Sequence, residues 1–226
     1  MVDIDTFSYM GFVRFDLKNK EFDQKFNQHF NDHIQELSNK PGYSTAWRTR
    51  ELRGADNAGV MEQEYQQIYA IKDPGLFKSF PQNPPPPVLE SEPWRRDIDN
   101  WGRVFYKVLS LTQHDDRNGR CWARIEMDFQ EEGKALSDIQ NEVLDYVKIL
   151  VRTLPGVHRV WQLQHVSHSA QIGSDPMGSH MLLYELDAPE NLFDPSLGEE
   201  RIPYPQRHSI IGRHFSRLLA KTHPIR

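Results

Sequence analysis

Two histidines four residues apart are the first candidates for chemistry in this sequence. His29 and His33 would share one face of a helix, where residues four apart are neighbours. The zinc-protease helix motif has this spacing but needs a glutamate after its first histidine, where Phe30 stands, so we predict no metal site. Imidazole titrates near neutral pH, which makes His33 the candidate general acid or base and His29 a candidate substrate contact. The alternative is a pair of exposed or hydrogen-bonded helical histidines.

Two arginines follow on a segment that reads as a strand. Side chains alternate along a strand, so Trp47 would face an apolar interior while Arg48 and Arg50 face the other side. Either arginine could bind a carboxylate or a phenolate. The alternative is a solvated face or a salt bridge to one of three nearby glutamates: Glu51, Glu62 and Glu64.

Aromatic side chains are plentiful enough to line a pocket. Tyr65 is the candidate to assist catalysis, and Trp47, Tyr69, Trp101 and Trp161 are candidate substrate contacts. Core packing explains each of these residues equally well, taken singly.

The second half has its own histidines: His158, His165, His168 and His180. One of them could be a haem or metal ligand, but His165 and His168 would point to opposite faces of a strand, which favours a surface role.

Cys121 is the only cysteine and lies in an expected strand, so we predict that it is buried, without a disulfide. No dinucleotide, phosphate-loop or hydrolase-elbow motif occurs, and no cofactor is expected.

Composition excludes several classes of protein. The formal charge of −5 and the scattered basic residues argue against a nucleic-acid partner. No apolar stretch is long enough to span a membrane, and the first residues do not resemble a signal peptide. A single cysteine fits a reducing compartment, so we expect a cytoplasmic protein.

An internal repeat organises the chain. Pro41-Gly42 begins PGYSTAWRTRE and Pro155-Gly156 begins PGVHRVWQLQH, with a tryptophan six positions after each proline. Two further pairs of segments match in the same order, 66–77 with 181–193 and 101–112 with 211–222. We therefore predict two repeats, residues 1–114 and 115–226, joined in a polar, turn-rich segment.

Each repeat reads as β-α-β-β-α. Expected first strands cover 11–17 and 121–129, and amphipathic helices cover 21–40 and 135–154. Last helices are predicted over 92–111 and roughly 206–221, with any fourth strand short or missing. One antiparallel sheet leaves an apolar face bare, but two such units can cover each other. The fold class is thus α+β: two ferredoxin-like repeats fused into one barrel-type domain.

Segment 26–51, FNQHFNDHIQELSNKPGYSTAWRTRE, and segment 182–193, LLYELDAPENLF, resemble the EthD-like branch of the dimeric α/β-barrel superfamily. The likeness rests on His33, the Pro-Gly turn and the basic strand after it. Gln35 stands where many relatives have a proline, and Val147 occupies the place of His33 in the second half. The resemblance therefore places any chemistry of that family in the first half.

The resemblance implies a lyase, isomerase or cyclase that moves a proton beside a carbonyl in an aromatic, polyketide-like or lactone-type small molecule. His33 would be the acid or base, and Arg48 or Arg50 would hold an anionic oxygen. The alternatives are a cofactor-independent monooxygenase of a phenolic substrate, a non-catalytic binder of a hydrophobic metabolite, and a haem protein. The fused repeat makes a monomer possible, and a homodimer is the other expectation.

Overall fold

The computed structural model describes residues 7–52, 64–73, 75–76, 97–129, 136–166, 179–194, 199–200 and 208–222. Its main strands form a closed antiparallel barrel in the order β1-β3-β2-β10-β5-β7-β6-β4. Their bounds are β1 Tyr9–Leu17, β2 Tyr43–Glu51, β3 Tyr65–Ile71, β4 Ile98–Gln113, β5 Cys121–Phe129, β6 Val157–His165, β7 His180–Leu186 and β10 His208–Thr222.

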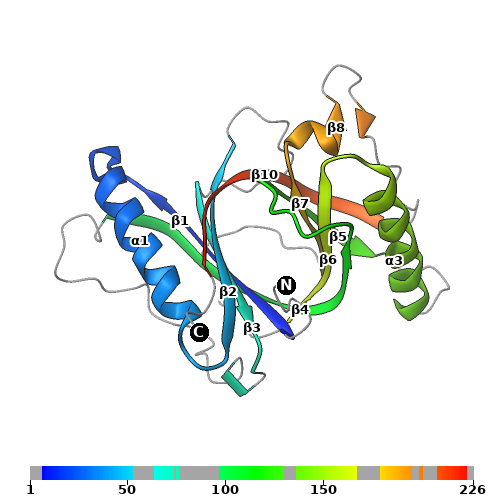
Figure 1. Ribbon diagram of the computed structural model, residues 1–226, viewed down its shortest axis with the longest axis horizontal. Helices are drawn as coiled ribbons and strands as arrows, with labels where there is room; N and C mark the ends of the chain where they lie inside the picture. Colours follow the sequence, from blue (N-terminus) through cyan, green and yellow to red (C-terminus); the bar gives the residue numbers. More distant parts are fainter. Residues whose placement is uncertain are drawn as a thin grey trace.

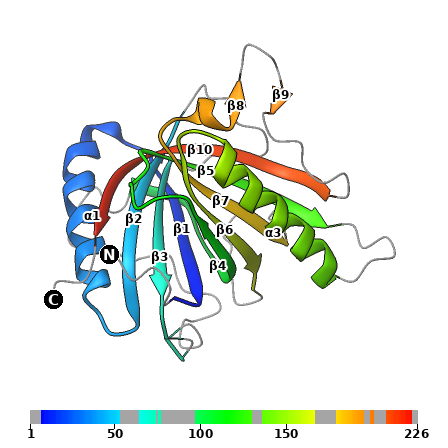
Figure 2. The same cartoon turned by 45° about the vertical axis from the view of Figure 1, so that its right-hand side comes forward.

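Two described helices pack on the outside of this barrel, on opposite sides (Figures 1 and 2). Helix α1 (Asp23–Ser38) covers β1, β2 and β3, and helix α3 (Leu136–Thr153) covers β5, β6 and β7. A short two-stranded sheet, β8 (Phe193–Asp194) with β9 (Glu199–Glu200), lies beyond the 3-10 turn η4 (Pro189–Asn191). The predicted α+β barrel is confirmed.

The predicted last helices are wrong, because both segments are long strands. β4 pairs with β1 and β6, and β10 pairs with β5 and β2, so each of these strands joins one half of the barrel to the other. Val104 and Val108 fit a helical spacing as well as a strand face. The segment is nevertheless rich in β-branched and aromatic residues, which favour a half-buried strand. Among the described residues, each half therefore contributes barrel strands and a helix in the order β-α-β-β-β, and the second half adds the short β8–β9 sheet before its last strand.

The two Pro-Gly turns end the helices as predicted. Gly42 and Gly156 have φ of 86° and 79°, a backbone conformation that residues other than glycine rarely adopt. The same element order occurs before and after residue 114, which lies between β4 and β5. The barrel is continuous across that point, and the division into two repeats stays a prediction.

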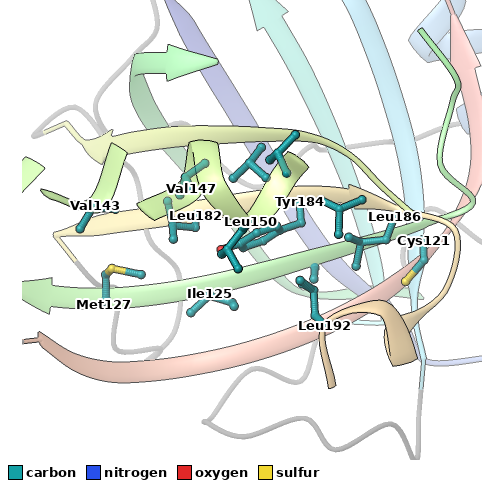
Figure 3. Close-up of a cluster of buried hydrophobic side chains, with 14 residues drawn as sticks. Cys121, Ile125, Met127, Val143, Val147, Leu150, Leu182, Tyr184, Leu186 and Leu192 are labelled. Atoms are coloured by element: carbon teal, nitrogen blue, oxygen red, sulfur yellow. The ribbon is translucent and has the colours of Figure 1, made fainter. Parts of the chain in front are cut away.

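Alternation along the strands divides the buried side chains into an inner set and two outer sets. The interior cluster comprises Met10, Phe12, Trp47, Ile68, Ala70, Val104, Tyr106, Trp122, Trp161, Leu163, Met181 and Leu183. Beneath α3 lies an aliphatic cluster, in which Val143, Val147 and Leu150 of the helix face the strands (Figure 3). Beneath α1 the packing is aromatic, with Phe15, Phe26, Phe30 and Tyr65 in contact.

Candidate functional site

The structure brings three of the predicted catalytic residues together beneath the first turns of α1. Arg50 donates to Glu64 Oε1 from Nε at 2.9 Å and from Nη2 at 2.6 Å, and its Nη1 lies 3.8 Å from Asp23 Oδ2. Tyr65 donates its hydroxyl to Asp23 Oδ1. Burial, together with that hydrogen bond, raises the pKa of Tyr65 to about 12. The hydroxyl therefore stays protonated at neutral pH. Of the three glutamates considered as partners, Glu64 is therefore the one that pairs with Arg50, and Glu62 lies outside the described residues.

Arg48 belongs to the same group and is fully buried. Its Nη1 donates to the backbone oxygen of Asn27 at 3.1 Å and to Asn31 Oδ1 at 3.0 Å, and Nη2 donates to Asn27 Oδ1. The guanidinium carbon lies 5.2 Å from the ring centre of Phe26 and 5.5 Å from that of Tyr65. Burial lowers the pKa of Arg48 to about 10, which leaves it charged. These contacts hold α1 on β2.

His33 and His29 lie farther along α1. Their rings are parallel with centres 6.2 Å apart, both rings contact Phe30, and both side chains are partly exposed. Ten residues separate His33 from Asp23, about 15 Å along a helix axis. His33 is therefore not assembled with the Asp23–Tyr65 pair. Within the described residues no group of three or more His, Cys, Asp or Glu is placed to hold a metal ion.

The predicted tryptophans lie inside the barrel. Trp47 of β2 and Trp161 of β6 have ring centres 6.2 Å apart, and Trp122 of β5 stacks on Trp161 at 5.2 Å with 9° between the planes. Among the described residues, none of the three indole Nε1 atoms has a hydrogen-bond partner, although all three are buried. Tyr69 instead faces Ile34 of α1. Trp101 lies in β4, and its side chain is outside the description.

A charged group that sequence reasoning missed lies in the same interior. Arg14 of β1 and Arg124 of β5 stand two residues after Phe12 and Trp122, and so face inward like them. Arg14 Nη1 is 3.9 Å and Arg124 Nη1 is 3.5 Å from the same oxygen, Oε1 of Glu126. Burial, and then the charge of Arg14, lowers the pKa of Arg124. Two guanidinium groups thus converge on one buried carboxylate.

Tyr106 of β4 completes this interior group. Its hydroxyl is buried and makes no hydrogen bond among the described residues. Burial and the charge of Glu126 raise its pKa well above the usual range. His165 is paired with Tyr106 across β4 and β6, with ring centres 5.8 Å apart, and burial lowers the pKa of His165. The interior therefore holds a protonated phenol and a neutral imidazole beside the two arginines.

The strand registers relate the interior charges of the two halves. Gly11 pairs with Tyr69 and Phe105, and Ala123 pairs with Tyr184 and Phe215, the matching residues of the second half. Arg14 therefore corresponds to Glu126, and Asp16 corresponds to Asp128: each of these two aspartates accepts a backbone N–H at 2.7 Å, from Glu64 and Ser179. Strand alternation carried the signal that could have found the arginines, because each stands two residues after an inward aromatic side chain.

The expected surface role of the second-half histidines is wrong for His158 and His180, which are both buried. His158 Nδ1 lies 3.0 Å from Asp115 and Nε2 lies 2.9 Å from Asp187. His180 Nε2 lies 3.2 Å from Gln140 Nε2, and Nδ1 lies 3.0 Å from Ser179 Oγ. Both ring nitrogens of each residue are thus engaged by protein, so neither fits an axial haem ligand. His168 lies outside the described residues.

Cys121 behaves as predicted. Its side chain is buried among the aliphatic residues beneath α3, and burial raises the pKa of the thiol to about 12. Almost none of it is thiolate at neutral pH, so it is a packing residue.

A scan against protein-family models gives no match, and neither does a search of the curated proteins. Solved structures do share the fold. An anthrone oxidase-like protein has a TM-score of 0.57 at 8% identity, over 95% of this chain and 92% of that chain. A protein assigned as a monooxygenase from Lactobacillus acidophilus scores 0.55 at 8% identity, over 96% of each chain. One assigned as a chlorite dismutase scores 0.57 at 14% identity, over 95% and 96%. At these identities the likeness establishes the dimeric α/β-barrel fold alone.

The main reaction class expected from the sequence is corrected by these neighbours. They are named oxidase-like, monooxygenase and chlorite dismutase, and none of the three names is a lyase, isomerase or cyclase. The alternative of a cofactor-independent monooxygenase agrees with them better.

Among the described residues, no helix has the length and apolar character needed to cross a membrane.

Proposed function

We propose that this protein is a monooxygenase that oxidises a phenolic aromatic compound with O₂ inside the barrel, without a bound redox cofactor. The observation that carries the proposal is the make-up of the interior. Three contacting tryptophans lie in the same barrel as two arginines, a glutamate and a tyrosine whose hydroxyl has no described partner. Buried polar atoms without partners call for an explanation, and a bound molecule supplies one. The names of the structural neighbours point the same way.

The interior suits the two halves of such a substrate. Flat rings pack well against Trp47, Trp122 and Trp161, and the four groups Arg14, Arg124, Tyr106 and Glu126 can meet its oxygen atoms. The surrounding apolar side chains exclude water, which strengthens every charge interaction with the substrate. In this proposal Trp47 and Trp161 keep their expected role as substrate contacts. Arg48, Arg50 and Tyr65 support the fold.

The reaction balances without any further reagent. The phenol loses its proton to a base, for which His165 is placed, and the electron-rich ring reduces O₂ as a carbon–oxygen bond forms. Tyr106, which stays protonated, donates a hydrogen bond to the developing peroxide on the substrate. Loss of water across the remaining C–H and O–O bonds leaves a carbonyl. One oxygen atom ends in the product and the other in water.

The closed barrel is built from a single chain, which supports a monomer as the working unit. The matching positions in β2 and β6, and the equivalent bonds of Asp16 in β1 and Asp128 in β5 to a backbone N–H, support an origin by duplication of one barrel half. Sedimentation of the purified protein at two concentrations tests the first inference: a concentration-dependent dimer would oppose it.

Oxygen uptake with an anthrone or a hydroxynaphthalene tests the proposed activity. We expect O₂ consumption, and a product heavier by one oxygen and lighter by two hydrogens that takes its new oxygen from isotopically labelled O₂. Tyr106→Phe should lower kcat roughly 10- to 100-fold. His33→Ala, on the outer helix, is the matched control and should leave kcat unchanged. Binding without O₂ uptake would overturn the proposal in favour of a non-catalytic binding protein.

A further inference from the structure

We propose that Lys221, near the end of β10, is a covalent binding site that forms an imine with aromatic aldehydes or ketones. Its side chain lies on the inner face of the barrel, because Lys221 pairs with the inward Trp47 across β10 and β2, and residues paired in this way share a face. Its Nζ lies 5.8 Å from the centre of the Trp47 ring. This chemistry is separate from the oxidation proposed above and uses an amine that has no part in it.

The surroundings of Lys221 favour the neutral amine, which is the form that attacks a carbonyl group. Among the described residues, Nζ donates to a neutral acceptor, Asn118 Oδ1 at 2.6 Å, and forms no ion pair. Burial lowers the pKa of Lys221; the charge of Glu185 acts against this shift, and that of Arg159 adds to it. Glu185 is itself bound at both oxygens, by Arg159 Nη1 at 2.6 Å and by the backbone N–H of Gly119 at 3.0 Å. Desolvation and a neighbouring cation are the two ways in which proteins activate a lysine as a nucleophile.

Two buried donors at this end of the barrel are suited to the oxygen of a carbonyl compound. The indole Nε1 of Trp47 and the guanidinium Nε of Arg159 are buried and have no hydrogen-bond partner among the described residues. The two side chains are 3% and 2% exposed, whereas Lys221 is half-buried. The amine therefore lies where the interior meets solvent, within reach of an entering aldehyde. The indole ring beside it offers a surface on which an aromatic group can stack.

The reaction is a condensation that needs no oxidant or reductant. The lone pair of Lys221 Nζ forms a bond to the carbonyl carbon, and the electron pair of the carbonyl double bond moves to its oxygen. A proton passes from nitrogen to that oxygen, which gives a carbinolamine. Loss of this hydroxyl together with the remaining N–H proton, as water, leaves a carbon–nitrogen double bond. An N–H donor nearby stabilises the oxygen while it carries negative charge.

Reductive trapping in the full chain tests the proposal. The protein is incubated at neutral pH with 2-naphthaldehyde and cyanoborohydride, which reduces imines to stable amines, and peptide mass mapping measures the label on each lysine. We expect Lys221 to be labelled roughly 10-fold faster than Lys148, an exposed lysine of α3 whose Nζ lies 3.0 Å from Asp145. Labelling of Lys221 no faster than that of Lys148 would overturn the proposal.

A second aldehyde and two variants test the ligand class and the residue. With cyclohexanecarbaldehyde, which lacks the aromatic ring, the ratio of Lys221 to Lys148 labelling should fall roughly threefold, and an unchanged ratio would overturn the aromatic ligand class. Lys221→Arg should lose the fast label, whereas Lys148→Arg, the matched control, should keep it. A fast label that survives in Lys221→Arg would belong to another amine and would overturn the assignment. Both labelling ratios compare two lysines of one folded wild-type chain, so they hold even where a variant folds poorly.

Discussion

The two helices pack on the same barrel by different means. Beneath α3 the buried side chains are mostly aliphatic, with Val147 and Leu150 against Leu182. Beneath α1 aromatic rings surround the buried charge of Arg48. The first interface is stabilised by apolar area and close packing, whereas the second depends on the geometry of a planar cation and its acceptors.

One pair of equivalent strand positions, in β2 and β6, shows the chemical difference between the two helix interfaces. Arg48 and Gln162 each follow the tryptophan of their repeat, and each donates to a helix carbonyl, Asn27 O at 3.1 Å and Gln140 O at 3.3 Å. Gln162 is neutral, and its Oε1 also accepts a hydrogen bond from Ser110 Oγ at 3.2 Å. The buried charge of Arg48 is stabilised by the surrounding aromatic rings and amide oxygens. The same strand position therefore accommodates either a charged arginine or a neutral glutamine.

The largest expected effect comes from removing the charge beneath α1. Arg48→Ala should lower the free energy of unfolding by about 3–4 kcal/mol, because the partly buried acceptors on Asn27 and Asn31 lose their donor and a cavity opens under the rings. Gln162→Ala, the matched change beneath α3, should cost only about 1–2 kcal/mol. Urea denaturation measures both, and equal losses would erase the contrast between the interfaces.

Conservative substitutions distinguish the close packing beneath α3 from the dependence on guanidinium geometry beneath α1. Leu150→Ala should cost about 3 kcal/mol through the cavity it leaves, but Leu150→Met less than about 1.5 kcal/mol. Arg48→Lys keeps charge and much of the volume but loses the planar fork, so about 2 kcal/mol is still expected. Denaturant midpoints of the three variants provide the check. A harmless Arg48→Lys would show that charge alone is sufficient beneath α1.

The smallest expected effect is a loss of folding stability at acid pH, caused by His180. Burial lowers the pKa of His180, beneath α3, to about 4, below the ordinary value near 6.5 expected when unfolded. The unfolded chain then binds the extra proton, so stability is complete above about pH 6.5 and falls by roughly 2 kcal/mol toward pH 4. Thermal melts across this range should show the decline, and His180→Gln should flatten it. An unchanged slope in the variant would assign the acid sensitivity to other groups.

Local pattern predicted much of the fold. The Pro-Gly turns, both described helices and the strand faces of Trp47 and Arg48 all followed from spacing, because helices and strands impose their own periods on side chains. β4 and β10 were misread as helices; in β4, Val104 and Val108 stand four apart and also satisfy a helical period. The long-range pairing of these strands with both halves of the barrel decides between the two structures.

The sequence by itself determined which residues alternate, which turns need glycine, and that Cys121 would be buried. Only the tertiary structure decided that Arg14, Tyr106, Arg124 and Glu126 belong together, because they come from three strands that meet only when the barrel closes. It also decided that Arg48 and Tyr65 lie beneath a helix with internal partners. Spacing along a chain specifies the face on which a side chain lies, whereas barrel closure specifies what lies opposite it.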